Sequence, residues 1–282
     1  EPVLYHSVLN GWLDGVVDGG PASGDSDRAS PAAPDYTPVK VTLPLGDNGH
    51  IAVEHFYTAG ERKGIVVALS GRAGNKRQFV PGVSAIVEGG WDMILPEYNE
   101  IEGDSTRAKL EGNVGSARAA FDYALSQADT VVGFGFGAGT SALAEAAADY
   151  DLAACVFFET PSDGAIDQWI TAVEEPKLFV HSADDIVHPY EDAWKVFQLA
   201  PQPKFFFTKQ IEQATRASHD PDIYSCVVDG WLNGVVSTDL VHSERYHELL
   251  LEELQYYDQD LLSLLPYRWG DSQAPANTLN RD

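Results

Sequence analysis

Short apolar runs alternate regularly with longer helical patterns through the centre of this chain, and this alternation restricts the possible folds more than any other feature. The runs cover residues 64–69, 92–95, 130–134, 152–158, 177–181 and 204–208. Segments with helical spacing or helix-forming composition lie between them, at residues 78–88, 105–126, 140–149 and 190–199. Each run is too short for a buried helix, so the order is strand, helix, strand. The pattern predicts an α/β fold whose mostly parallel sheet carries helices on both faces.

Composition divides the chain further into segments. Residues 39–45 and 51–57 flank a Gly-Asp-Asn-Gly turn and predict an antiparallel hairpin that leads into the sheet. We expect an amphipathic helix over residues 1–18, a linker rich in Gly, Pro, Ser and Ala over 19–38, and the α/β domain over 39–237. Residues 238–282 are expected to form a C-terminal helix and a polar tail that pack on the same domain.

The charge balance limits the partners of the chain. Its 282 residues include 43 acidic and 18 basic side chains, a formal charge of −25, and 44% of the residues are hydrophobic. The hydrophobic content supports a sizeable core, while the negative charge repels phosphate backbones and anionic lipid headgroups. No apolar run reaches the length of a membrane span. We therefore expect no nucleic-acid partner and no membrane span, and the acidity suggests a saline environment or general solubility.

The sequence begins with Glu1 and Pro2, and on this ground we expect a processed protein that is secreted or periplasmic. Its only cysteines are Cys155 and Cys226. An oxidising compartment would allow them to form a disulfide. The alternative is two separate buried thiols, because Cys155 lies inside an apolar run and free cysteine is among the most buried residue types.

Ligands of open parallel sheets bind beyond the carboxyl ends of the strands, so the residues that follow each run are the candidates for a site. Residues 66–75 (VVALSGRAGN) resemble the first core strand and oxyanion loop of the α/β-hydrolases, with Ser70-Gly71 where His-Gly is usual. Residues 91–98 resemble the next strand and its turn, and residues 131–139 (VVGFGFGAG) the strand that leads into the nucleophile elbow, G-x-S-x-G. The resemblance implies an α/β-hydrolase-like sheet over residues 39–236.

The elbow requires glycines two residues before and two residues after the nucleophile, because the strand must turn sharply into a helix. Two registers satisfy this spacing, one centred on Gly135 and one on Gly137. We favour Gly137, which leaves a strand of ordinary length, residues 130–134, before the turn. Glycine has no side chain to attack a carbonyl, so the acyl-enzyme route cannot begin there. The resemblance further implies a ligand-binding set, which consists of Ser70, Gly71, Arg72 and Ala138.

The remaining members of a catalytic triad are present in the family's chain order. Residues 182–189 (SADDIVHP) resemble the acid loop and make Asp184 the matching acid, with Asp185 as the fallback. His219 stands where the family places its histidine, ahead of the closing helix. The resemblance therefore implies that Asp184 and His219 are a relic acid and base. The alternative is that Asp184 caps the helix that begins near residue 190 and that His219 is an ordinary loop histidine.

Two other functions were weighed for the same segments. The glycines at 133–139 could form a phosphate loop, but their spacing lacks the wider gap of the dinucleotide motif and no lysine follows them. His181 and His188 flank two aspartates and could hold a divalent metal, but His181 ends a buried strand. We therefore expect neither a cofactor nor a metal.

Two functional hypotheses remain. The first is a non-catalytic or weakly active α/β-hydrolase-fold protein that binds an unidentified small molecule or protein in the former active-site cleft. The second is an active esterase-type hydrolase in which Ser141, Ser70 or an activated water replaces the lost nucleophile beside His219 and Asp184, and Ser141 is preferred to Ser70 because Ser70 lies in the oxyanion loop. Glycine at position 137 favours the first.

The chain also contains an internal repeat. Residues 5–18 (YHSVLNGWLDGVVD) and 224–237 (YSCVVDGWLNGVVS) are identical at eight of fourteen positions. The aromatic and aliphatic residues recur at helical spacing, so each copy predicts an amphipathic helix with one apolar stripe. We expect the first copy to dock on the body of the protein through Val8, Leu9, Trp12 and Leu13. Paired copies within one chain, or across the two-fold axis of a homodimer, are the two arrangements that this similarity suggests.

Overall fold

A computed structural model describes residues 36–46, 49–71, 79–97, 106–162, 164–182, 185, 188–209, 224–225 and 227–237. Its eight strands form one sheet in the order β1-β2-β4-β3-β5-β6-β7-β8. The strands are β1 (Val39–Leu45), β2 (Gly49–Phe56), β3 (Gly64–Leu69), β4 (Trp91–Pro96), β5 (Val131–Phe136), β6 (Ala154–Phe158), β7 (Lys177–Ser182) and β8 (Lys204–Lys209). Strands β3 to β8 pair in parallel, while β1 pairs antiparallel with β2, and β2 with β4. The predicted hairpin and mostly parallel sheet are thereby confirmed.

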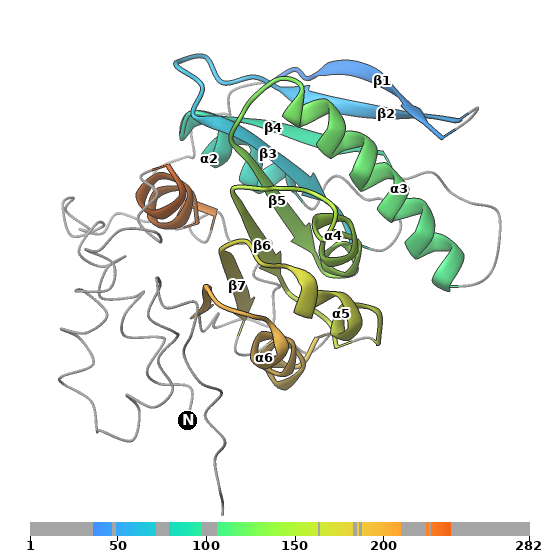
Figure 1. Cartoon of the computed structure of the whole chain (residues 1–282). Helices are drawn as coiled ribbons and strands as arrows, with labels where there is room; N and C mark the ends of the chain where they lie inside the picture. Colours follow the sequence, from blue (N-terminus) through green and yellow to red (C-terminus); the bar gives the residue numbers. More distant parts are fainter. Residues whose placement is uncertain are drawn as a thin grey trace, which may run out of the picture.

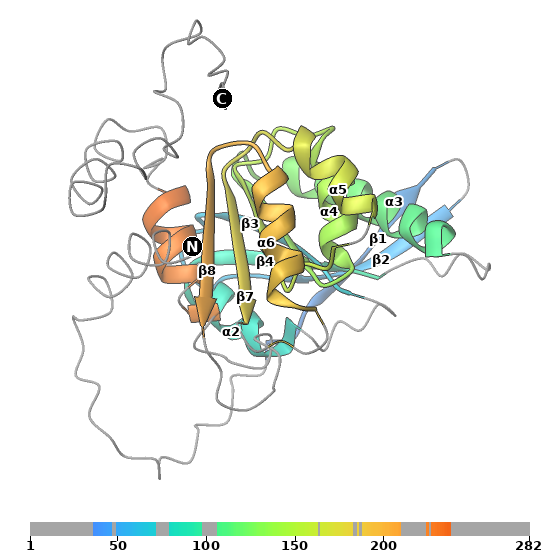
Figure 2. The same cartoon turned by 90° about the horizontal axis from the view of Figure 1, so that it is seen from below.

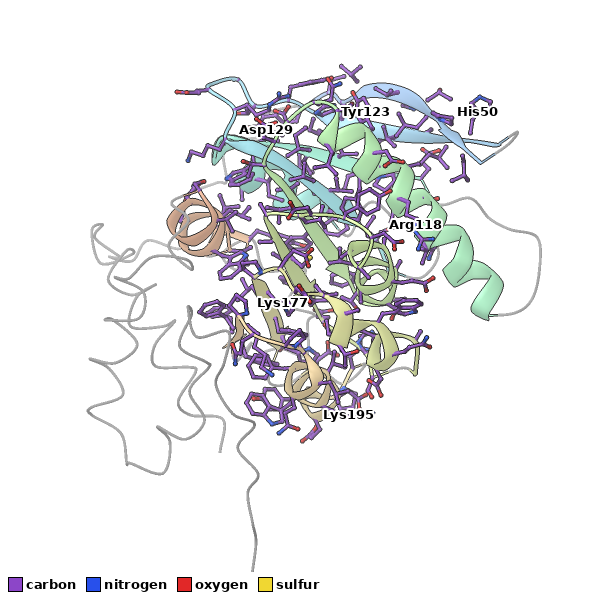
Figure 3. All side chains as sticks on the ribbon, viewed as in Figure 1. His50, Arg118, Tyr123, Asp129, Lys177 and Lys195 are labelled. Atoms are coloured by element: carbon purple, nitrogen blue, oxygen red, sulfur yellow. The ribbon has the colours of Figure 1, made fainter. Side chains whose placement is uncertain are left out.

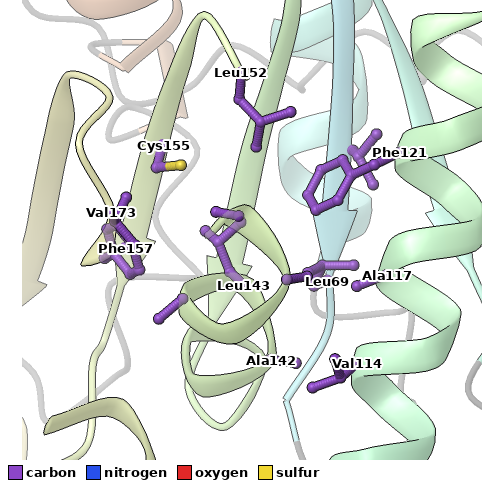
Figure 4. Packing of buried hydrophobic residues seen from close by; sticks show 14 of the residues in the cluster. Leu69, Val114, Ala117, Phe121, Ala142, Leu143, Leu152, Cys155, Phe157 and Val173 are labelled. Carbon is purple, nitrogen blue, oxygen red and sulfur yellow. The ribbon is translucent and has the colours of Figure 1, made fainter. Parts of the chain in front are cut away.

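Helices cover both faces of the sheet (Figures 1 and 2). One face carries α3 (Thr106–Leu125), α4 (Gly139–Ala147), α5 (Gly164–Trp169), the short helix η3 (Ile170–Ala172) and α6 (Tyr190–Leu199). The other face carries α2 (Val80–Glu88) and η5 (Val227–Val236). Each face has its own hydrophobic core, and Figure 4 shows the first of these, where Leu143 of α4 packs near Leu69 of β3 and Phe121 of α3. Ion pairs join Arg118 of α3 to Asp149, two residues after α4, and Lys195 of α6 to the half-buried Asp167 of α5. Figure 3 labels Arg118 and Lys195 on their helices.

Strand β5 shows why the sheet can carry helices so closely. Side chains alternate along a strand, so Phe134 and Phe136 face the core under α2 and η5. Gly133 and Gly135 face the opposite helices. A Cβ at Gly135 would lie 2.7 Å from the Cα of Thr140. Helix α4 can approach the strand this closely only because glycine has no side chain. The predicted strand 130–134 ended two residues too early, since Gly135 belongs to the strand and not to the turn.

The structure decides between the two alternatives for Cys155 on this face of the molecule, in favour of the buried free thiol. Cys155 lies in β6 as a free, fully buried thiol, so the disulfide with Cys226 is not formed. Burial raises the pKa of Cys155, which keeps the thiol protonated and unreactive. Cys226 itself lies outside the described residues. The connection between β6 and β7 contains α5 and η3, which the sequence pattern had not predicted.

Helix η5 confirms the amphipathic helix predicted over the second copy of the repeat. It is wound as a π-helix, and its last turn closes with the bond from the backbone N–H of Ser237 to the carbonyl of Leu232, at 2.9 Å. Trp231 and Leu232 are buried against the sheet, while Asp229 is exposed. The first copy of the repeat and the predicted C-terminal helix lie outside the described residues. None of the helices in the described ranges has the length and apolar character needed to span a bilayer.

Candidate functional site

The strand-to-helix turn between β5 and α4 is centred on Gly137. Its φ of +51° lies in the left-handed region, which glycine adopts without steric cost. The Gly137 N–H donates to the carbonyl of Phe158 at the end of β6, at 2.9 Å. The backbone N–H and the hydroxyl of Thr140 both donate to the Gly137 carbonyl, at 3.0 and 2.6 Å. The structure thus places Gly137, and not Gly135, at the sharp turn from strand to helix.

Close backbone packing requires glycine at positions 135 and 139. At position 137 glycine is favoured by the positive φ and not by the packing. A Cβ at Gly139 would lie 2.2 Å from the carbonyl oxygen of Leu69, at the end of β3. Among the described residues beyond its chain neighbours, the one atom within 4 Å of a Cβ placed on Gly137 is Nε2 of His188, at 3.8 Å. The turn therefore has room for a side chain at its centre, and a histidine ring faces that space.

Bonds to its backbone hold His188 in this position. The His188 N–H donates to Oδ1 of Asp185 at 3.0 Å, and the His188 carbonyl accepts a hydrogen bond from Nε2 of His181 at 2.8 Å. Asp185, the fallback acid of the sequence analysis, therefore shapes the loop that presents His188. From the sequence, His188 was considered only as a candidate metal ligand. Its position in a loop after β7 was the signal that could have identified it, because such loops meet at the carboxyl edge of the sheet.

His181 is a buried structural partner of this loop. It lies at the end of β7 with 1% of its surface exposed, and burial lowers its pKa, so the ring is neutral at pH 7. Because a carbonyl can only accept, the hydrogen bond to His188 assigns the proton of His181 to Nε2. Nδ1 of His181 is buried and has no hydrogen-bond partner within the described part of the chain. In the same part of the chain no cluster of three or more His, Cys, Asp and Glu side chains has an arrangement that could hold a metal ion.

Glu159 is a further charged residue beside the elbow, and the sequence analysis did not find it. It follows β6 directly, is fully buried, and has a φ of +49°. Such a conformation costs a non-glycine residue about 1–2 kcal/mol, and strained residues of this kind concentrate at functional sites. The preceding residue, Phe158, accepts the hydrogen bond from Gly137, so Glu159 stands next to the turn. Burial, and secondarily the charge of Glu159, raises the pKa of Tyr224.

The other predicted site residues are placed as follows. Ser70 and Gly71 are buried directly after β3, and a Cβ at Gly139 would lie 2.7 Å from the Ser70 carbonyl oxygen, so the oxyanion-loop strand touches the elbow. Ala138 is half-buried and precedes α4, whose N-terminus has no side-chain cap.

Three predicted residues, Arg72, Asp184 and His219, lie outside the described residues. The convergence of Asp184 and His219 on the elbow therefore stays a prediction. Ser141 lies in the first turn of α4 with 1% of its surface exposed, so in this conformation its hydroxyl is shielded from a substrate.

Comparisons with known proteins agree with this architecture. No protein-family model and no curated protein sequence matches the chain. Solved structures match over about two thirds of it, at low sequence identity. The esterase domain of a Rhodothermus marinus protein is 16% identical, with a TM-score of 0.56, covering 68% of this chain and 94% of its own. Dienelactone hydrolase from Anabaena variabilis is 15% identical, with a TM-score of 0.59, covering 70% and 98%.

A third structure, a Xanthomonas campestris α/β serine hydrolase without lid, is 14% identical, with a TM-score of 0.52, covering 62% of this chain and 84% of its own. At these identities the likeness concerns the arrangement of the backbone. Sheet order, crossover helices and the glycine turn after β5 agree with that likeness, and the chain has the α/β-hydrolase fold.

Proposed function

We propose that this protein binds a neutral acyl compound at the elbow without cleaving it. The single observation that supports the proposal is Gly137, which occupies the strained turn and faces His188 across a space that a nucleophilic side chain would fill. Without a hydroxyl or thiol at this position, no acyl-enzyme can form there. The turn still offers what a carbonyl oxygen needs, namely backbone N–H groups at the uncapped start of α4.

Charge favours a neutral ligand over an anion. The chain has a formal charge of −25, and the buried carboxyl of Glu159 lies beside the turn. The net charge disfavours a carboxylate ligand through like-charge repulsion, and the buried carboxyl offers such a ligand no positive charge to pair with. An ester or amide keeps the accepting carbonyl oxygen and carries no charge. His188, which faces the same space, supplies a second polar group for the ligand.

Catalysis is tested first. Wild-type protein is incubated with p-nitrophenyl butyrate and, separately, with a fluorophosphonate that labels active serines. We expect hydrolysis at the uncatalysed rate and no adduct by intact mass. Robust turnover that Ser141→Ala abolishes would overturn the proposal in favour of an esterase with a displaced nucleophile.

Binding is tested with three probes of equal chain length: ethyl butyrate, butyramide and butyrate. In ¹⁵N-labelled protein we expect the neutral pair to shift the amide signals of Gly137, Ala138 and Gly139, and butyrate to shift them less. His188→Ala should weaken the response to the neutral probes. Equal shifts for butyrate, or shifts confined to other amides, would remove the support for an acyl-binding site.

A further inference from the structure

The docking surface of η5, here called the η5 seat, consists of Lys63, Gly82, Gly89, Trp91, Phe134, Phe158 and Phe205. Two glycines on and just after α2 open it. A Cβ at Gly82 would lie 2.4 Å from the ring of Tyr224, and a Cβ at Gly89 would lie 2.2 Å from Cγ1 of Val228. These missing side chains let η5 and Tyr224, three residues before it, approach α2 closely, so the seat has a specific shape.

Aromatic contacts and one polar contact complete the fit. Tyr224 stacks on the rings of Phe158 and Phe134, and Trp231 packs against Phe205 with ring centroids 5.0 Å apart. The polar contact comes from Asn233. Its Oδ1 accepts hydrogen bonds from Nε1 of Trp91 and from Nζ of Lys63, both at 2.9 Å.

The first copy of the repeat preserves the side chains that this seat recognises. Alignment of residues 5–18 with 224–237 places Tyr5, Val8, Trp12 and Leu13 at the positions of Tyr224, Val227, Trp231 and Leu232, all of which are buried. Among the positions that differ, residues 225, 229 and 237 are exposed, so those differences do not touch the seat. The described positions at which the two copies agree thus include the aromatic and aliphatic side chains that make the main contacts with the seat.

Two differences do touch the seat, and both are compatible with it. Asp14 replaces Asn233. The hydrogen bonds that Asn233 makes with the described residues use its carbonyl oxygen, so a carboxylate can accept both of them and also pair with the ammonium of Lys63. Leu9 replaces Val228 in the hollow at Gly89, which must hold one more methylene group. The first copy therefore fits the seat slightly less well than η5.

The first copy is also tethered beside the seat. The described chain begins at Tyr36, whose hydroxyl donates to Oε1 of Glu88, the last residue of α2, at 2.8 Å. The 17 residues 19–35 can span about 55 Å when extended, which exceeds the distance across a domain of this size. A short tether gives its segment an effective concentration near the millimolar range, so the segment of the same chain has the advantage over one from a second molecule.

We propose that residues 5–18 of the same chain are a second occupant of the η5 seat, so that the two copies of the repeat compete for one docking surface. Helix η5 holds the seat in the structure, and the N-terminal copy replaces it when η5 is weakened. The proposal is independent of the proposed acyl binding at Gly137.

A thermal-unfolding cycle on the full chain tests the exchange with Trp12→Ala, Trp231→Ala and the double variant. Trp12→Ala should change the melting temperature by less than about 2 °C, because η5 fills the seat. Trp231→Ala should lower it only partly, because the first copy moves in. The double variant should lose about 10 °C, the shift expected for truncating a buried tryptophan in a domain of this size, and more than the sum of the single changes. Additive shifts would overturn the proposal.

A second variant keeps the test decisive if Trp231→Ala does not fold. It gives the 224–237 segment the sequence of the first copy through Ser225→His, Cys226→Ser, Val228→Leu, Asp229→Asn, Asn233→Asp and Ser237→Asp. We expect a melting temperature within about 4 °C of the wild type. A loss of 10 °C or more would show that the first copy cannot fill the seat.

Light scattering decides which molecule supplies the second occupant. The Trp231→Ala variant is measured at two protein concentrations, with the wild type as the control. A monomeric mass for the variant supports exchange within one chain. A variant-specific dimer would overturn the same-chain part of the proposal and assign the second occupant to another molecule.

Discussion

Replacement of Gly137 by serine is the most informative perturbation of the elbow. A serine side chain fits the described surroundings, because the one described atom beyond the chain neighbours within 4 Å of its Cβ would be Nε2 of His188, at 3.8 Å. The φ of +51° costs a non-glycine residue about 1–2 kcal/mol, and the lower entropy of the unfolded chain offsets about 0.5 kcal/mol of this. The net loss of about 1 kcal/mol corresponds to a melting temperature about 2–4 °C lower, so the variant should fold.

The serine hydroxyl oxygen lies one bond beyond Cβ, so rotation about χ1 brings it within hydrogen-bond reach of His188. We expect Gly137→Ser to hydrolyse p-nitrophenyl butyrate about 100-fold faster than the wild type and to form a fluorophosphonate adduct. Gly137→Ala is the matched control, because it carries the same backbone strain without the hydroxyl. Addition of His188→Gln to Gly137→Ser should remove the gain.

One result would refute this reasoning directly. His219 is the base that the chain order predicts, so Gly137→Ser is also combined with His219→Ala. If His219→Ala abolishes the gain and His188→Gln leaves it intact, the base was assigned correctly from the sequence, and the proximity of His188 has no chemical role. A folded Gly137→Ser variant with neither turnover nor adduct would refute both assignments.

Three further predictions concern stability. Gly139→Ala should lower the melting temperature by more than 10 °C, because the new Cβ at position 139 would lie 2.2 Å from the backbone oxygen of Leu69. Gly137→Ala should lower it by about 2–4 °C, and equal losses for the two variants in thermal scans would contradict the packing argument. Burial lowers the pKa of Lys177 from 10.5 to about 8, so the unfolded state binds more protons between these values and stability rises with pH across that window. Lys177→Met should remove this rise, which is worth about 2 kcal/mol between the two points of urea titrations at pH 8 and 10. Burial lowers the pKa of His181 below 6.5, so stability falls as pH drops through 6.5, and His181→Gln should flatten the melting-temperature profile between pH 7 and 5; a profile parallel to that of the wild type would show that another group titrates.

The fold could be predicted from the sequence because its signals are local. Strand β3 and helix α6 match their predicted bounds, since an apolar run between polar turns and a helical stripe each fix their own limits. The end of β5 was harder to predict, because glycine signals both turns and close backbone approach. Gly135 serves close backbone approach, and this is visible only from its packing against helix α4 in the folded chain.

The site was predicted less completely because it depends on contacts between distant segments. The glycine pattern identified the turn at Gly137, whose left-handed φ the structure describes. No sequence rule could tell which histidine faces this turn, since the position of His188 depends on its bonds to Asp185 and His181. Glu159 was missed because an isolated acidic residue after a strand is usually solvated, and its burial and positive φ are properties of the folded chain.

Strand β8 ends the described sheet, and its sequence, Lys-Phe-Phe-Phe-Thr-Lys, carries a risk of its own. Three consecutive phenylalanines on an edge strand form a template for aggregation, which flanking lysines only partly suppress. Phe206 is covered from the α6 side, whereas Phe205 depends on Trp231 of η5 for its cover. Loss of η5 from its seat would therefore expose Phe205 on one face of this edge strand. If the second copy of that helix took the place of η5 in the seat, it would keep this face of β8 covered and so oppose self-association.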